Sequence, residues 1–234
     1  MLFASKRMYL THQLDVENLF EIKIDGTVLE RVSEWKVLGI HFDEHLKWNH
    51  QINKLLKSCY SKLFVLRKLK RFSSFNNRKH LAESLILSKL DYCNVLYSNV
   101  TQQSINRMQK LLNSVASFVT GKYCKIEDVI NLGWLPIRER IEFSTLKLAH
   151  KSIYDDNFPD YLSLEFMKSS RTLRSNNDVF NLVRDVDGTF RGTASKLYNI
   201  LPYNIKSLSN SKTYSMKLKQ YLLGKSLATH LSKY

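Results

Sequence analysis

The pattern of hydrophobic and polar positions predicts a small β element near the start of the chain. Residues 20–24 alternate apolar and polar side chains, and the Asp25-Gly26 dipeptide after them favours a tight turn into a return strand over residues 27–29. Residues 36–42 are predicted to form a further strand, in which Gly39 would permit close approach of another backbone. Together these signals predict a short hairpin or strand element.

From about residue 43 to about residue 71 the pattern changes to the three- and four-residue spacing of an amphipathic helix. The apolar positions with this spacing fall within one sector about 100° wide. They are Trp48, Ile52, Leu55, Leu56, Cys59, Leu63 and Leu66. Lys54, Lys57, Lys68 and Arg71 fall on the opposite side. The pattern therefore predicts a helix with one face in the core and a row of cations along the other.

Shorter amphipathic segments predict that much of the remaining chain is helical. Helices are expected over residues 78–92, 101–119, 127–132, 135–154 and 208–231. Residues 155–204 are less periodic. The sequence therefore predicts a mainly α fold, with a small N-terminal β element, a helical bundle and a less regular basic C-terminal region.

The charge of the chain is large and unevenly distributed. It carries a formal net charge of +15, with 36 Lys and Arg against 21 Asp and Glu. Residues 47–80 hold ten of the basic residues and residues 188–234 hold eight, and neither segment contains an acidic residue. Charge of one sign on predicted helices is typical of proteins that bind a polyanion, whereas charge that serves solubility alone usually mixes both signs. We therefore expect a nucleic-acid partner.

The sequence shows no signal for a cofactor, a metal or a membrane. Cys59, Cys93 and Cys124 are more than 30 residues apart, which favours reduced thiols in an intracellular protein over a disulfide framework or a zinc site. The N-terminus lacks the pattern of a secretory signal, and no segment has the roughly 18 apolar residues of a membrane helix. We expect no cofactor, no bound metal and no membrane partner, in a nuclear or cytoplasmic protein.

Two acidic strings have the residue types of metal-binding motifs, but their context favours turns. Tyr154-Asp155-Asp156 resembles the metal-binding turn of reverse transcriptases, yet it closes a predicted helix, where Asp commonly serves a turn. Asp185-Val186-Asp187-Gly188 resembles the start of a calcium loop, yet the acidic ligand at the end of such a loop is missing. We therefore predict no catalytic residue and no enzymatic activity of this chain on its own.

Several short strings resemble, in order, segments from the C-terminal part of non-LTR retrotransposon (LINE, jockey-like) reverse transcriptases. The strongest is Val37–Asp43 followed by Leu46–Ile52, which is similar to the family's YLGVxLDxxLxWxxHI. Weaker similarities, to the family's KTxxMxF, SxLxY, LQxxQN, xxLPI and WNxLP segments, lie at Met1–Phe3, Ser88–Tyr92, Met108–Asn113, Leu132–Pro136 and Tyr198–Pro202. Tyr198 stands where the family usually has Trp. The resemblance covers nearly the whole chain.

The resemblance implies three parts. Residues 1–43 would be a remnant of the palm and primer grip, with Leu38 and Gly39 in the primer-grip strand, residues 44–155 a helical thumb-like domain, and residues 156–234 a basic extension. In the family, the fingers, most of the palm and the catalytic aspartates precede this part, so the resemblance transfers no catalytic residue. A thumb helix holds the sugar–phosphate backbone of a template–primer duplex, which does not require it to read bases.

Charge and resemblance together predict a non-catalytic fragment of an RNA-directed DNA polymerase that binds an RNA–DNA duplex, a DNA duplex or RNA through phosphate contacts. The expected contacts are Lys54, Lys57, Lys68 and Arg71, with Lys62, Arg67, Lys70, Arg78 and Lys79 in second rank. Two alternatives stay open. The chain would otherwise be a module that binds an acidic protein or the missing palm and fingers, or a decayed fragment with no selected activity.

Overall fold

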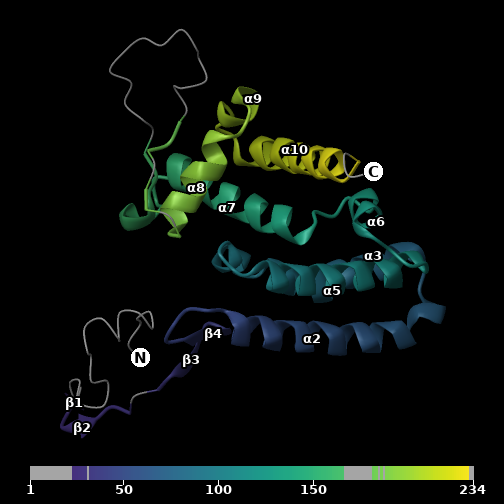
Figure 1. Ribbon diagram of the computed structural model, residues 1–234, viewed down its shortest axis with the longest axis horizontal. Helices are drawn as coiled ribbons and strands as arrows, with labels where there is room; N and C mark the ends of the chain where they lie inside the picture. The colour runs from purple at the N-terminus through teal and green to yellow at the C-terminus, as the bar shows by residue number, and fades with distance from the viewer. Residues whose placement is uncertain (1–22, 31, 166–180, 184, 187, 232–234) are drawn as a thin grey trace. The chain divides into compact units, whose positions relative to one another are not determined.

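The chain is mainly helical, with two short antiparallel hairpins that precede the first described helix (Figure 1). The computed structural model describes residues 23–30, 32–165, 181–183, 185–186 and 188–231. The predicted fold class is confirmed within these residues. Residue contacts divide the chain into two units, Met1–Ser58 and Cys59–Tyr234.

The first hairpin forms where the sequence predicts it. Strand β1 (Lys23–Ile24) pairs with β2 (Thr27–Val28), and the turn between them has φ of +48° at Asp25 and +78° at Gly26. Positive φ at both central residues matches the twist of the flanking strands, and Asp-Gly is well suited to it. The residues predicted to extend this strand at 20–22 lie outside the described residues.

The strand predicted over residues 36–42 is instead a second hairpin. Strand β3 (Glu34–Val37) pairs antiparallel with β4 (Ile40–Asp43), and Leu38 and Gly39 form the turn at φ of +48° and +85°. Val37, Leu38 and Ile40 are apolar with only Gly39 between them, which resembles one continuous strand, and a leucine at positive φ gives no sequence signal. Gly39 therefore serves the turn and not the close backbone approach that we predicted.

Helix α2 (Asn49–Lys68) is shorter than predicted at both ends and crosses the division between the two units. Before it, Asp43 Oδ1 accepts hydrogen bonds from the backbone N–H groups of His45 and Lys47 at 2.9 and 3.0 Å. These bonds hold an irregular turn where we expected the first helical turn. After it, the chain tightens into the 3₁₀ turn η1 (Lys70–Phe72).

After α2 and η1, short connections join most of the helices of the second unit. In chain order these helices are α3 (Phe75–Ala82), the π-helical η2 (Glu83–Leu87), α4 (Ser88–Asp91), the 3₁₀ turn η3 (Asn94–Tyr97), α5 (Gln102–Thr120), α6 (Ile126–Asn131), α7 (Ile137–Tyr154), the 3₁₀ turn η4 (Asp160–Leu162), α8 (Phe190–Asn199), α9 (Tyr203–Lys206) and α10 (Ser211–Leu231). The helix predicted over 78–92 corresponds to α3, η2 and α4 in succession. It begins earlier than predicted because Ser74 accepts the backbone N–H of Asn77 as an N-cap.

Helix α5 agrees closely with the helix predicted over residues 101–119. The Thr101 hydroxyl accepts the backbone N–H of Ser104 at 3.3 Å and caps the first turn. Gly121 ends the helix at φ +85°, a conformation that glycine adopts without the steric penalty of a side chain. The apolar stripe of α5 is buried, as its spacing predicts.

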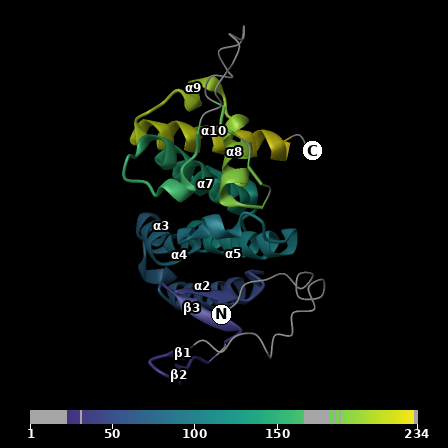
Figure 2. The same cartoon turned by 90° about the vertical axis from the view of Figure 1, so that its left-hand side faces the viewer.

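Helix α7 connects the central helices of the second unit to its C-terminal helices. It contacts α5, and it also contacts α8 and α10 (Figures 1 and 2). The shared core includes Leu146 from α7, Tyr198 from α8 and Leu218 from α10, all at most 1% exposed. Burial of each such side chain contributes about 1.5–3 kcal/mol. Contacts therefore continue across the predicted division between residues 155 and 156.

Candidate nucleic-acid interface

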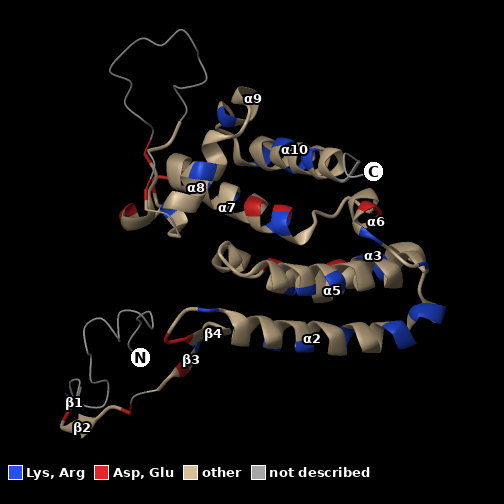
Figure 3. Cartoon of the chain, in the orientation of Figure 1, with Lys and Arg blue, Asp and Glu red and all other residues tan. Residues whose placement is uncertain are grey.

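Helix α2 carries several basic residues and no acidic residue (Figure 3). Lys54, Lys57, Arg67 and Lys68 are exposed, while Lys62 is half-buried. None of these five has an acidic partner within ion-pair distance among the described residues. The helix therefore offers positive charge that the rest of the described chain does not neutralise.

In the first unit, Lys54 is held beside two histidines. Its ammonium lies 3.2 Å from Nδ1 of His41, and the rings of His41 and His50 meet edge to face with centroids 5.7 Å apart. Desolvation, the Lys54 charge and the Lys36 charge lower the pKa of His41. The Nδ1 atom of the neutral imidazole accepts a hydrogen bond from the ammonium, which orients Lys54.

Aromatic side chains lie among the cations near the end of α2, which sequence reasoning missed. Phe64 is 62% exposed, and the ammonium of Lys68 lies 4.7 Å from the centre of its ring. Phe72 on η1 is 87% exposed, and Phe75 is also exposed. The sequence held one signal for these aromatic residues: Phe64 lies outside the apolar stripe of the predicted helix. A phenylalanine in that position does not contribute to the core.

Several second-rank candidates have structural roles or limited exposure. The ammonium of Lys79 donates a hydrogen bond to the carbonyl oxygen of Leu132 at 2.9 Å, which satisfies a backbone group at the end of α6. Arg78 is half-buried, and its Nε atom is enclosed with no hydrogen-bond partner among the described residues. Arg71, a first-rank candidate, is exposed but lies on η1, beyond the end of α2.

The two predicted primer-grip residues lie together at the tip of the β3–β4 hairpin. Leu38 is 87% exposed, and Gly39 completes the turn. The exposed leucine places apolar side-chain surface at the hairpin tip.

The C-terminal basic segment is more internally engaged than its charge suggests. Lys206 is 3% exposed, and its ammonium donates to Asn181 Oδ1 at 2.8 Å and to the carbonyl oxygen of Asn199 at 2.7 Å. Arg191 pairs with Asp185 and Lys225 with Glu142. Lys212, Lys217 and Lys219 are exposed on α10. This segment therefore contributes less free charge than the residue count implies.

A basic cleft of about 680 Å³ lies wholly within the second unit. Its lining comes from the second half of α2, from one face of α5 and from the loop after α5. Three cations line it, Arg67, Lys110 and Lys122, and no acidic residue does. Lys110 had not been predicted as a site residue, because its presence in one cleft with Arg67 depends on how the helices pack.

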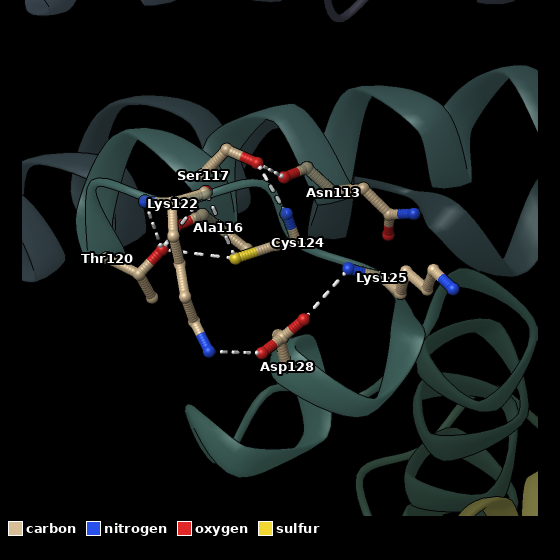
Figure 4. A network of polar contacts seen from close by, with 8 residues as sticks. All are labelled: Asn113, Ala116, Ser117, Thr120, Lys122, Cys124, Lys125 and Asp128. Atoms are coloured by element: carbon tan, nitrogen blue, oxygen red, sulfur yellow. Dashed lines mark hydrogen bonds and ion pairs between the residues drawn. The ribbon is translucent and has the colours of Figure 1, made fainter.

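The loop beside this cleft is fixed by a dense hydrogen-bond network (Figure 4). Ser117 Oγ accepts the backbone N–H of Cys124 at 3.0 Å and donates to the carbonyl of Asn113 at 2.9 Å. The carboxylate of Asp128 accepts the backbone N–H of Lys125 at 3.0 Å and pairs with the Lys122 ammonium at 2.9 Å. The same two contacts lower the pKa of Asp128, which keeps it charged.

The acidic string after α7 forms a turn. Tyr154 ends the helix, and Asp155 Oδ1 accepts the backbone N–H of Asn157 at 3.0 Å while Oδ2 lies 3.5 Å from Lys151 Nζ. In the described part of the chain, no group of three His, Cys, Asp or Glu residues is placed to hold a metal ion. Asp187 of the second acidic string lies outside the described residues.

None of the described helices is both long and apolar enough to cross a bilayer. Comparison of the chain with protein-family models, with curated proteins and with solved structures found no match.

Proposed function

We propose that this chain is a non-catalytic, nucleic-acid-binding fragment of a retroelement RNA-directed DNA polymerase. It binds a duplex or structured RNA through phosphate contacts and acts in the nucleus or cytoplasm. The observation that carries the proposal is the exposed, acid-free cationic face of α2. The motif strings of the sequence support the retroelement origin, and an exposed hairpin tip at Leu38 and Gly39 is compatible with a primer-grip role.

The lysines and arginine on this face favour contact with phosphate groups. Lys57 and Arg67 are exposed on α2, which is one continuous helix from Asn49 to Lys68. Every nucleic-acid sequence carries the same phosphate groups, so contacts with them carry no sequence information directly. The proposed binding is therefore strong at low salt and weakly selective.

The test is charge reversal at Lys54 and Lys57. We expect the double variant to bind a labelled RNA–DNA duplex at least tenfold more weakly at low salt, with a shallower salt dependence, because each lost phosphate contact removes about 0.9 from the slope on B-form DNA. Fluorescence anisotropy across a salt series measures both quantities. Two exposed lysines of α7, Lys147 and Lys151, provide the matched control, since their reversal changes the net charge equally.

Equal loss in the α7 control would show that only overall charge matters, which contradicts a site on α2. A loss confined to one duplex sequence would contradict phosphate binding. No binding of the parent chain at low salt would remove the nucleic-acid function altogether.

A second candidate is docking of a palm-like protein partner, favoured by the exposed aromatic residues near the end of α2. Phe64 and Phe72 expose apolar surface that the described chain does not cover. Surface of this kind often marks a protein contact. Self-association of the chain that a Phe72→Ser substitution abolishes, without any change in duplex affinity, would favour this candidate.

A further inference from the structure

The cleft between α2 and α5 in the second unit has the chemistry of a single-nucleotide site. We infer that it holds one unpaired nucleotide of a single-stranded segment, with its phosphate on Arg67 and Lys110 and its base on Tyr123 or Tyr60. This inference deepens the proposed function, because it adds a single-strand site beside the proposed duplex contacts of α2.

The charge of the cleft indicates an anionic ligand. Arg67 of α2 and Lys110 of α5 both line it, and neither has an acidic partner within ion-pair distance among the described residues. Lys122 also lines it but is already paired with Asp128. The ammonium of Lys70 lies 3.7 Å from the position that a Cβ on Gly121 would occupy, which places a further cation near the rim. Two cations that line the same cleft with no acidic partner favour a phosphate group.

The aromatic residues of the cleft indicate that the ligand also carries a planar ring. Tyr123 is 83% exposed and Tyr60 is 43% exposed, although both line the cleft. Rings that the core does not cover provide stacking surfaces, and every base has a face that can stack. The bases of a duplex are already stacked on each other, so these tyrosines favour an unpaired nucleotide.

The size and rigidity of the cleft fit the same ligand. Its volume of about 680 Å³ exceeds what a lone phosphate requires and lies within the usual range of about 300–1,000 Å³ for small-ligand sites. On its α5 wall the side chain of Asn113 adds an amide group, whereas the hydroxyls of Ser114 and Ser117 already donate to backbone carbonyl oxygens of α5. The hydrogen-bond network of Figure 4 anchors both ends of the tripeptide Lys122–Cys124, which carries Tyr123. The backbone N–H of Lys122 donates to the Thr120 hydroxyl, and that of Cys124 donates to the Ser117 hydroxyl. The stacking residue is therefore held on a fixed loop.

The test compares three labelled ligands by fluorescence anisotropy: a short single strand of mixed sequence, a blunt RNA–DNA duplex and the same duplex with a single-stranded extension. We expect the extension to increase affinity. Tyr123→Ala should abolish most of this gain, a loss of about fivefold or more, which is the lower end for one stacked base. Tyr161→Ala is the matched control, because Tyr161 is also strongly exposed but lies outside the cleft.

Charge and stacking are separated by a second pair of variants. Lys110→Gln should reduce the salt dependence of single-strand binding by about 0.7 in slope, the value for one phosphate contact on a single strand. Lys147→Gln on α7 removes the same charge elsewhere and should leave the slope unchanged.

The outcomes distinguish this inference from the proposed function. Duplex binding with no gain from the extension, or an equal loss in the Tyr123 and Tyr161 variants, would overturn the nucleotide site and leave the duplex function intact. Single-strand binding without duplex binding would overturn the duplex function and leave the nucleotide site intact. Displacement of the single strand by millimolar inorganic phosphate, to the same extent in the parent and Tyr123→Ala chains, would reduce the cleft to an anion site and overturn the stacking role.

Discussion

At the scale of single residues, burial of His150 lowers the pKa of its ring and gives the side chain a role in packing. It is 2% exposed, stacks on Tyr214 with ring centroids 4.0 Å apart, and its Nε2 atom lies 2.8 Å from the carbonyl oxygen of Leu208. Desolvation lowers its pKa, and the hydrogen bond to Leu208 opposes this effect only in part. The neutral imidazole therefore links α7 to the segment that leads into α10.

This pKa shift predicts that the folded state loses stability as the pH falls below about 6.5, the ordinary pKa of histidine. Above that pH both states hold a neutral ring, whereas below it the unfolded chain binds the proton first. We expect His150→Gln to flatten the decline in melting temperature between pH 7.5 and 5.5. His80→Gln, at an exposed position, should leave the decline unchanged. An identical pH profile in the parent and His150→Gln chains would contradict this role.

At the scale of secondary-structure elements, the start of α8 depends on one glycine. A Cβ at Gly192 would lie 2.0 Å from the carbonyl oxygen of Val186, so the backbone of the preceding turn occupies the space of a side chain. The backbone N–H of Gly192 also donates to the Thr189 hydroxyl at 3.0 Å, which caps the helix. The turn and the helix are therefore packed directly against each other.

We predict that Gly192→Ala lowers the free energy of unfolding by about 1–3 kcal/mol or more, because overpacking forces the backbone to move. Gly224→Ala provides the contrast, since a Cβ there meets no atom within 4 Å and the site lies inside α10. That substitution should stabilise the chain by up to about 1 kcal/mol. Urea denaturation followed by circular dichroism measures both, and similar effects of the two substitutions would refute the packing argument.

The sequence predicted those elements whose signals are local. Helix α5 was placed nearly to the residue, because Thr101 caps its start and Gly121 permits the left-handed end. The β3–β4 hairpin was missed, because its turn places Leu38 at positive φ, which leucine rarely adopts. Local patterns report the conformations that residues favour, and the hairpin is imposed by pairing between strands.

The candidate sites show the same limit. The exposed lysines of α2 were predicted from helical spacing alone, because exposure on a helix follows from the position of its apolar stripe. Burial of Lys206 and the place of Lys110 beside Arg67 were not predictable in this way. Both depend on which helices pack together, and no periodicity within one helix encodes that.

At the scale of the whole molecule, the C-terminal helices belong to the core of the second unit. Tyr214 and Leu218 of α10 are buried in the same cluster as Leu146 and Ala149 of α7. The Tyr214 hydroxyl also donates to the carbonyl oxygen of Leu146 at 3.3 Å. Residues 156–234, predicted as a basic extension, are thus required to cover the apolar face of α7.

We therefore predict that a chain ending at residue 188, without α8, α9 and α10, does not unfold cooperatively. The apolar face of α7 would be exposed to water, and the dye ANS should bind it. A chain ending at residue 231 serves as the control, since it keeps all described helices. Differential scanning calorimetry provides the measurement. A sharp transition in the shorter chain would show that residues 156–234 form a separable extension after all.

The accessibility of the three cysteines has a consequence for chemical labelling. Cys59 and Cys124 are buried, and burial raises the pKa of Cys59 to about 11, whereas Cys93 is exposed on the second unit. Thiolate, and not thiol, is the reactive form. A maleimide dye should therefore attach selectively at Cys93 in the unmodified protein. Cys93 lines neither the α2 face nor the basic cleft, so the natural chain provides a reporter for binding at both.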